Sequence, residues 1–189
     1  MNSKPITFIN IFDQTIEGAG TIVKIEIPII QRDYAQGRIT KDVTRIRDQF
    51  IEALHKALKG GIEDAVKLDF VYGNVEDGKL IPLDGQQRLT TLFLLHWYIA
   101  KKENIALEQV NFLKSFTYKT RFSSQYFCGS LVDCKPDFNC ETLSEWIIDQ
   151  NWFMYSWEKD PTIKSMLVMI DKIHETFKEQ FHLWDRLLD

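Results

Sequence analysis

The chain has 189 residues, of which 44% are hydrophobic and 26% charged, and its formal net charge is −4 at pH 7. These values are typical of one globular domain with or without an extension, and they exclude a disordered or low-complexity chain. The longest apolar run, residues 92–100, is too short to cross a bilayer, and the N-terminus lacks a signal-peptide pattern, so we expect a cytoplasmic protein. Three cysteines without a matching histidine set predict reduced thiols rather than disulfides or a zinc site.

The charge is unevenly distributed. Residues 31–59 carry seven Lys/Arg against four Asp/Glu, and residues 101–121 carry five against two. Residues 130–189 carry six against twelve. The mild overall acidity argues against indiscriminate coating of DNA, but two basic segments allow a local phosphate site. Ordinary solvated helix faces explain the same charges equally well.

The first predicted element is a strand over residues 22–27, where side chains alternate with a period of two before Pro28. Residues 41–58 have the apolar spacing of a helix, and Gly60 and Gly61 predict its end. Asp77-Gly78 then predicts the turn of a β-hairpin.

A helix follows from about Gln86, and it is apolar on almost every side, which predicts a central, buried position. The string "FTYKTRFSSQYF" that comes later has no clear period and is interpreted as a polar loop. Helices are predicted over residues 141–149 and from about Thr162 through Phe181, the latter with Pro161 in its first turn.

The predicted fold class is therefore α+β. A small sheet with two helices occupies residues 1–101, and a mainly helical extension occupies residues 102–189. The final segment is still amphipathic where the sequence ends, so we expect the chain to be part of a longer protein.

The string Asp84-Gly85-Gln86-Gln87-Arg88 joins a strand to the buried helix. The first amide groups of a helix have no internal partners and carry partial positive charge, so such a junction can bind an anion. Gly85 allows close backbone approach, and Arg88 can fold a planar cation onto a phosphate. The amides of Gln86 and Gln87 can orient water or grip a base or ribose.

Asp84 has two interpretations that the sequence leaves open. It can be the N-cap of the helix, accepting from the first amide groups. It can also hold Mg²⁺ beside a bound nucleotide, or polarise an attacking water.

A second polar cluster, Gln31, Arg32, Asp33 and Tyr34, directly follows the first strand. It is either a solvated connection with one Arg–Asp pair, or a second phosphate or base contact in which Tyr34 supplies a flat face. A weaker cluster lies in the predicted polar loop: Tyr118, Lys119, Arg121, Ser123, Ser124 and Gln125. His96 is interpreted as a core histidine. The chain contains no Walker A loop, zinc-protease motif or nucleophile elbow.

Taken together, "IPIIQRDYAQGR" and "LDGQQRLTTL" resemble the N-terminal domain of GmrSD-type, modification-dependent (type IV) restriction enzymes, and the corresponding region of the phage-defence protein SspE. "YKTRFSSQYF" and "DPTIKSMLVMIDKIH" are similar to later parts of the same family, so the resemblance covers most of the chain. It implies a ParB/sulfiredoxin-like core that binds and hydrolyses nucleoside triphosphate with Mg²⁺ and couples this to a nuclease.

The resemblance also implies roles for individual residues. Asp84, Gln87 and Arg88 would be catalytic, with Asp84 holding the metal. The nucleotide-binding residues would be Gln31, Arg32, Tyr34, Gly85, Gln86 and Arg88. The sequence departs from the family pattern where Ile30 replaces a tyrosine and Gln36 a tryptophan, which puts a role in sensing modified DNA in doubt.

The HNH-type nuclease half of that family is absent from this chain, so DNA cleavage would need another region or a partner. The leading hypothesis is thus a nucleotide-binding, NTP-hydrolysing regulatory domain of a restriction system that acts on DNA. The alternative is a non-catalytic module that senses DNA or binds another protein. No DNA-contacting residue is identified from the sequence.

Overall fold

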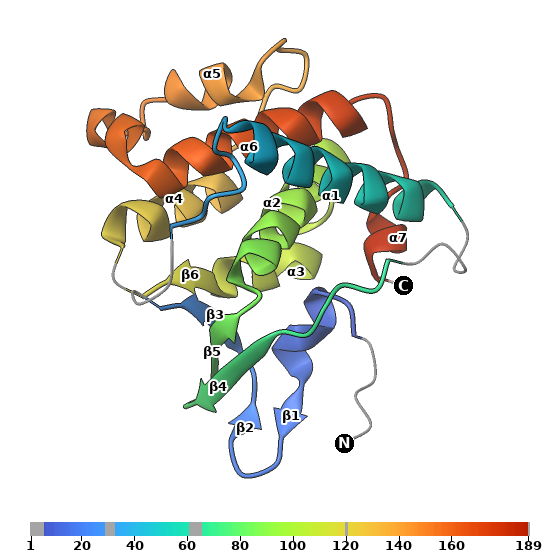
Figure 1. Cartoon of the computed structure of the whole chain (residues 1–189), viewed down its shortest axis with the longest axis vertical. Coiled ribbons are helices and arrows are strands. Elements are labelled where there is room, and N and C mark those ends of the chain that lie inside the picture. Colours follow the sequence, from blue (N-terminus) through green and yellow to red (C-terminus); the bar gives the residue numbers. More distant parts are fainter. Residues whose placement is uncertain (1–5, 29–32, 61–65, 120, 189) are drawn as a thin grey trace.

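The computed structural model describes residues 6–28, 33–60, 66–119 and 121–188. It has an α+β fold, as predicted, with helices layered over one face of a small mixed sheet (Figure 1). The strands are β1 (Thr15–Ile16), β2 (Gly20–Thr21), β3 (Lys24–Ile27), β4 (Tyr72–Glu76), β5 (Lys79–Asp84) and β6 (Phe116–Tyr118). The α-helices are α1 (Lys41–Lys59), α2 (Gln86–Lys102), α3 (Leu107–Val110), α4 (Phe122–Asp133), α5 (Leu143–Ile148), α6 (Pro161–Phe177) and α7 (Trp184–Leu188). The 3₁₀ helices are η1 (Ile9–Asp13), η3 (Asn111–Ser115) and η4 (Tyr155–Lys159).

The main sheet has four strands in the order β4-β5-β3-β6. β3 runs parallel to both of its neighbours, and β4 is antiparallel to β5. Because β3 is central, Ile25, Glu26 and Ile27 are all buried, including the polar member of the alternating pattern. A separate two-stranded ribbon, β1-β2, extends from the lower end of the molecule (Figure 1).

The β-hairpin predicted from Asp77-Gly78 is confirmed. Both residues have positive φ, 49° and 73°, as a two-residue turn of this kind requires. The hairpin delivers β5 to the centre of the sheet beside β3, and β5 leads directly into α2.

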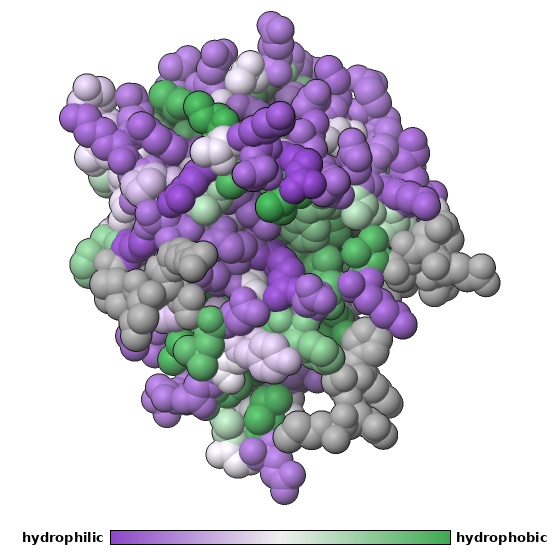
Figure 2. Space-filling model, in the orientation of Figure 1, coloured by the Kyte–Doolittle hydropathy of each residue, from purple (hydrophilic) through white to green (hydrophobic). Residues whose placement is uncertain are grey.

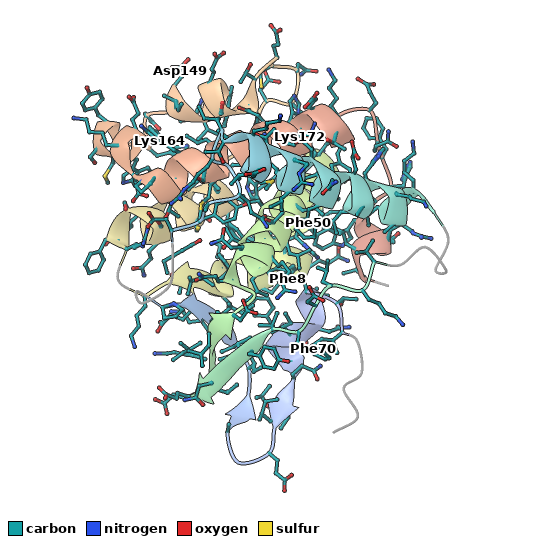
Figure 3. The ribbon with its side chains drawn as sticks, viewed as in Figure 1. Phe8, Phe50, Phe70, Asp149, Lys164 and Lys172 are labelled. Atoms are coloured by element: carbon teal, nitrogen blue, oxygen red, sulfur yellow. The ribbon has the colours of Figure 1, made fainter. Side chains whose placement is uncertain are left out.

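The buried central helix is also confirmed. α2 runs across the molecule beneath α1 and α6 (Figure 1), and twelve of its residues are buried. Phe50 projects from α1 towards α2, and Lys172 of α6 lies 4.0 Å from the Asp48 carboxylate of α1 (Figure 3). α6 thus packs against both α1 and α2, and α2 lies between these helices and the sheet.

His96 is a core histidine, as predicted. Its side chain is 2% exposed, and Nδ1 lies 2.8 Å from the Leu92 carbonyl oxygen. Burial lowers its pKa to about 4, which keeps the imidazole neutral in the folded protein. The three cysteines are free thiols, and burial raises the pKa of Cys128 and Cys134.

Two predictions for the second half need correction. The expected polar loop at "FTYKTRFSSQYF" is instead strand β6 and the beginning of helix α4. The last long helix ends at Phe177, so Phe181 lies outside it and is 62% exposed. Since β6 completes the same sheet as β3, the two halves divided at residue 101 share one sheet and one core.

Candidate functional site

The site is built where β5 ends and α2 begins. Gly85 is the N-cap of α2 and has φ of 85°, a conformation that favours glycine. A Cβ at this position would lie 2.9 Å from Cγ2 of Val71. The interpretation of Asp84 as the N-cap is therefore wrong, because the chain places Gly85 there without a capping side chain. The first hydrogen bond within the helix is donated by the Leu89 N–H to the Gly85 carbonyl at 2.9 Å. The backbone N–H groups in the first turn of α2, before Leu89, therefore lie outside the hydrogen-bond ladder of the helix.

Arg88 lies one turn into α2 and points back across the junction. Its Nη2 donates to the Phe70 carbonyl at 2.8 Å. Phe70 belongs to the segment just before β4, which lies below the start of α2 in Figure 3. The guanidinium also lies 3.5 Å from an Asp69 carboxylate oxygen and 3.8 Å from one of Asp84. The two carboxylate side chains are 98% and 73% exposed, so they face solvent in front of a mostly buried cation.

Gln87 fastens the segment that follows β3. Its Nε2 donates to the Asp33 carbonyl at 3.0 Å, and its Oε1 accepts from the Ala35 N–H at 2.8 Å. One side-chain amide thus holds two backbone groups fifty residues away in sequence. The water-orienting role predicted for Gln87 stays a prediction beside this observed positioning role.

Tyr34 is 2% exposed, and its hydroxyl lies 2.8 Å from the Thr91 hydroxyl inside the core. Burial raises the pKa of this phenol well above its ordinary value. The prediction that Tyr34 offers a flat face to a base is therefore wrong in this structure. Thr91 Oγ1 in turn lies 2.5 Å from Oε1 of Gln36, so the buried tyrosine helps to fix an amide at the surface.

These groups surround a pocket of about 380 Å³, a volume within the range of small-molecule sites. Its lining residues come from the loop after β3, from α1 and from the β5–α2 junction: Ala35, Gln36, Val43, Ile46, Asp84, Gly85, Gln86, Gln87 and Arg88. Figure 2 shows hydrophobic surface between α1 and β4 in the middle of this face, bordered by hydrophilic atoms. The pocket thus combines a helix N-terminus with an apolar wall.

Four lining residues were not predicted as site residues: Ala35, Gln36, Val43 and Ile46. Nothing in the sequence distinguishes the latter two from the other apolar positions of α1, although Ile46 is 51% exposed. Gln31 and Arg32, which were predicted to bind nucleotide, lie outside the described residues.

A family model, "GmrSD restriction endonuclease, N-terminal domain", matches residues 8–187. The chain belongs to this family. The predicted resemblance is thereby confirmed, and the protein is part of a restriction and phage-defence system. No curated protein and no solved structure matches the chain.

In this GmrSD N-terminal domain, the residues of the Asp-Gly-Gln-Gln-Arg motif all line the same pocket. A metal ion there would depend on very few protein ligands, because no group of three or more His, Cys, Asp or Glu side chains suited to a metal occurs in the described residues. Mg²⁺ commonly uses one or two carboxylates together with substrate phosphates, and the exposed carboxylates of Asp84 and Asp69 fit that pattern.

The weaker polar cluster contributes to a different part of the domain. Arg121 forms an ion pair with Asp33 and donates from Nη1 to the Thr162 hydroxyl at 2.7 Å. Ser123 donates to the Asp160 carboxylate. These contacts join the loop after β3 to the beginnings of α4 and α6.

None of the helices described in the domain has the length and apolar run of a membrane span.

Proposed function

We propose that this domain binds a nucleoside triphosphate in the pocket at the start of α2 and hydrolyses it. The observation that carries the proposal is the position of Asp84, Gly85 and Arg88 together at one helix N-terminus, at the edge of a cavity large enough for a small ligand. In the proposed system, an HNH-type nuclease domain or subunit cleaves DNA, and nucleotide turnover in this domain controls it.

Phosphate binding follows from the charges at the junction. The first-turn amides and the positive end of the α2 dipole attract an anion. Arg88 is now paired at 3.5 and 3.8 Å with two carboxylates that are themselves exposed, and solvent screening weakens such pairs. A triphosphate can therefore replace them, while the bond from Arg88 to the Phe70 carbonyl keeps the guanidinium oriented.

Asp84 is the residue that we propose to hold Mg²⁺ when nucleotide is bound. The ion would supply neutralisation of phosphate charge, which dominates catalysis of phosphoryl transfer. Asp84 is exposed and adjoins the α2 N-terminus, so its carboxylate is accessible without rearrangement of the core. Gln31 and Arg32 are proposed to complete the pocket, as the family resemblance implies.

The apolar wall gives the pocket a place for the uncharged part of the ligand. Val43 and Ile46 face the motif from α1, and Gln36 adds an amide held by Thr91. A base or sugar between these residues would leave the phosphates against Gly85 and Arg88. The proposed orientation therefore places the base towards α1 and the phosphates towards α2.

Titration of each NTP with Mg²⁺, with binding and phosphate release followed together, tests this function. We expect Arg88→Ala to abolish turnover and Arg88→Lys to retain only part of it, because lysine cannot form the planar fork. Lys56→Ala, which removes one exposed cation from the far end of α1, is the charge-matched control and should have wild-type turnover.

Circular dichroism and thermal unfolding of the Arg88 variants show whether loss of the Phe70 contact disturbs the fold. Wild-type turnover in a folded Arg88→Ala protein would refute the assignment of Arg88. Absence of binding to every NTP at millimolar concentration would refute the proposed function as a whole.

The second candidate is a non-catalytic DNA-sensing module. It is favoured by one observation: Arg38 from the first basic segment and Arg121 from the second both reach the Asp33 carboxylate, so the two segments meet in space. Duplex binding that weakens steeply with salt, without any phosphate release, would favour this candidate.

A further inference from the structure

A second hollow, of about 570 Å³, lies between the first turn of α4 and η4. It shares no lining residue with the pocket at α2. Phe122, Tyr126 and Met154 line it and are 68%, 62% and 53% exposed. Large apolar side chains that are exposed next to one another around a hollow make it a candidate binding surface.

Two of the aromatic side chains that line the hollow come from one helix. Phe122 and Tyr126 are four residues apart on α4, so their rings project from the same side of the helix. Trp157 forms the base of the hollow and is only 3% exposed. Edge-to-face contacts with Phe127 and Phe153, at 5.9 and 5.5 Å between ring centroids, hold its indole in place.

Asp160, the acidic residue that lines the hollow, already has hydrogen-bond partners within the protein. Asp160 caps α6 by accepting from the N–H groups of Thr162 and Ile163, at 2.8 and 3.2 Å, and it also accepts from the Ser123 hydroxyl. Its negative charge is therefore used inside the protein. Arg121 at the start of α4 is likewise occupied by Asp33 and Thr162.

Three exposed lysines in this part of the sequence have no ion pair with a described residue, and one of them, Lys159, lines the hollow. Among the described residues, no carboxylate lies within ion-pair distance of Lys119, Lys159 or Lys164, and all three are exposed. Lys159 lines the hollow, with its ammonium 5.6 Å from the Tyr155 ring centroid. Lys164 lies on the first turns of α6 (Figure 3), and Lys119 precedes α4 by three residues. Within the described part of the chain, the hollow thus has one exposed lysine without an ion pair, Lys159, beside aromatic side chains and the capping carboxylate of Asp160.

We propose that this hollow binds an unstacked nucleobase of a nucleic-acid strand, with Lys159 on the adjoining phosphate. The flat rings of Phe122 and Tyr126 suit the face of any base, and a lysine without an ion pair suits the backbone, which is the combination that single-strand binding sites use. A duplex would have to release a base to enter. The inference rests on the DNA partner of the proposed function and names the part of the domain that contacts it.

The test uses the whole 189-residue protein without nucleotide. A short fluorescein-labelled single-stranded oligodeoxynucleotide and its duplex are titrated and followed by fluorescence anisotropy. We expect the single strand to bind more tightly than the duplex. Tyr126→Ala and Phe122→Ala should each weaken single-strand binding about tenfold or more, as loss of a stacking ring does.

Phe181→Ala is the matched control. Phe181 is as exposed as Tyr126, but it follows the opposite end of α6, a helix about 25 Å long. Its removal should leave the affinity unchanged. Lys159→Ala should reduce the dependence of the single-strand affinity on salt concentration. An oligonucleotide that contains 2-aminopurine should lose fluorescence when it binds the wild-type protein but not when it is mixed with the Tyr126→Ala variant.

Two results would overturn the inference. One is equal affinity of wild type, Tyr126→Ala and Phe122→Ala for the single strand. The other is a change of self-association in these variants, seen by sedimentation velocity, without a change in oligonucleotide binding, which would make the hollow a protein interface. Phosphate release measured in the same variants is independent of this outcome, so failure of the base site is distinguishable from failure of the NTP site.

Discussion

Gln87 illustrates how much of the site depends on single side chains. Its amide both donates to the Asp33 carbonyl and accepts from the Ala35 N–H, whereas an ionised carboxylate of the same shape could only accept. A residue predicted from the family motif for chemistry thereby also fixes the loop that carries Gln36 into the pocket.

Gln87→Glu should separate these two roles. The carboxylate still accepts from Ala35 but meets the Asp33 carbonyl without a proton to donate, so we expect a loss of about 1–3 kcal/mol in the free energy of unfolding. Urea denaturation measures it, with Gln49→Glu on the exposed side of α1 as the control. An unchanged stability together with lost turnover would show that Gln87 acts only in catalysis.

His96 makes stability depend on pH. Its pKa in the folded protein is lowered to about 4, so the unfolded chain takes up the proton first as the pH falls below about 6.5. The contribution of neutral, buried His96 to the free energy of unfolding is therefore fully present above pH 6.5 and is lost as the pH falls towards 4. Between pH 7 and pH 5 this amounts to about 2 kcal/mol.

Urea denaturation of wild type and His96→Gln at several pH values checks this expectation. The variant should have a smaller fall in stability over the same interval, whereas His182→Asn, at an exposed histidine, should keep the wild-type slope. Parallel slopes for all three proteins would show that other groups cause the acid sensitivity.

At the scale of elements, α6 begins at a well-formed cap. Asp160 accepts from two backbone N–H groups, Pro161 fills the first helical position, and Ser123 of α4 donates to the same carboxylate. Asp160→Ala should cost about 0.5–2 kcal/mol from the cap alone. The loss should exceed that of Asp149→Ala, because Asp149 is exposed at the end of α5 (Figure 3). Equal losses in chemical denaturation would contradict the capping role.

Elements with strong local signals were predictable from the sequence. Asp77-Gly78 requires a turn wherever it stands between two strands, and Pro161 after Asp160 marks a helix start in any context. β6 was missed because its three residues form a strand only through pairing with β3, which is distant in sequence. α4 was missed because its polar and aromatic residues alternate without one apolar stripe; its burial is decided by α6 and η3, not by its own pattern.

The candidate site was predictable to a similar degree. Asp84–Arg88 were found from the motif because a strand-to-helix junction with glycine has a definite physical meaning. The apolar wall was not found, since Val43 and Ile46 belong to an ordinary amphipathic helix and only the fold brings them opposite the motif. Tyr34 was assigned to the surface because the sequence next to it is polar, but the hydrogen bond to Thr91 makes its burial possible.

At the scale of the whole molecule, Asp33 occupies a shared position between the two hollows. Its backbone is held by Gln87 at the first, and its carboxylate is paired with Arg121, which contacts Thr162 beside the second. A ligand that shifts Asp33 at one hollow therefore also shifts its partners beside the other. We expect binding at the two sites to be thermodynamically linked.

Linkage of this kind is reciprocal: a nucleotide that tightens oligonucleotide binding by some factor must itself bind more tightly by the same factor when the oligonucleotide is present. We expect such positive coupling in the wild-type protein, measured by titrating each ligand in the absence and presence of the other. Arg121→Gln should bring the factor close to one, while Arg186→Gln at the C-terminal helix should not. Independent binding in the wild type would mean that the Asp33–Arg121 pair has only a structural role. Coupling would mean that a single ion pair connects the binding of a nucleic-acid strand thermodynamically to the binding of a nucleotide.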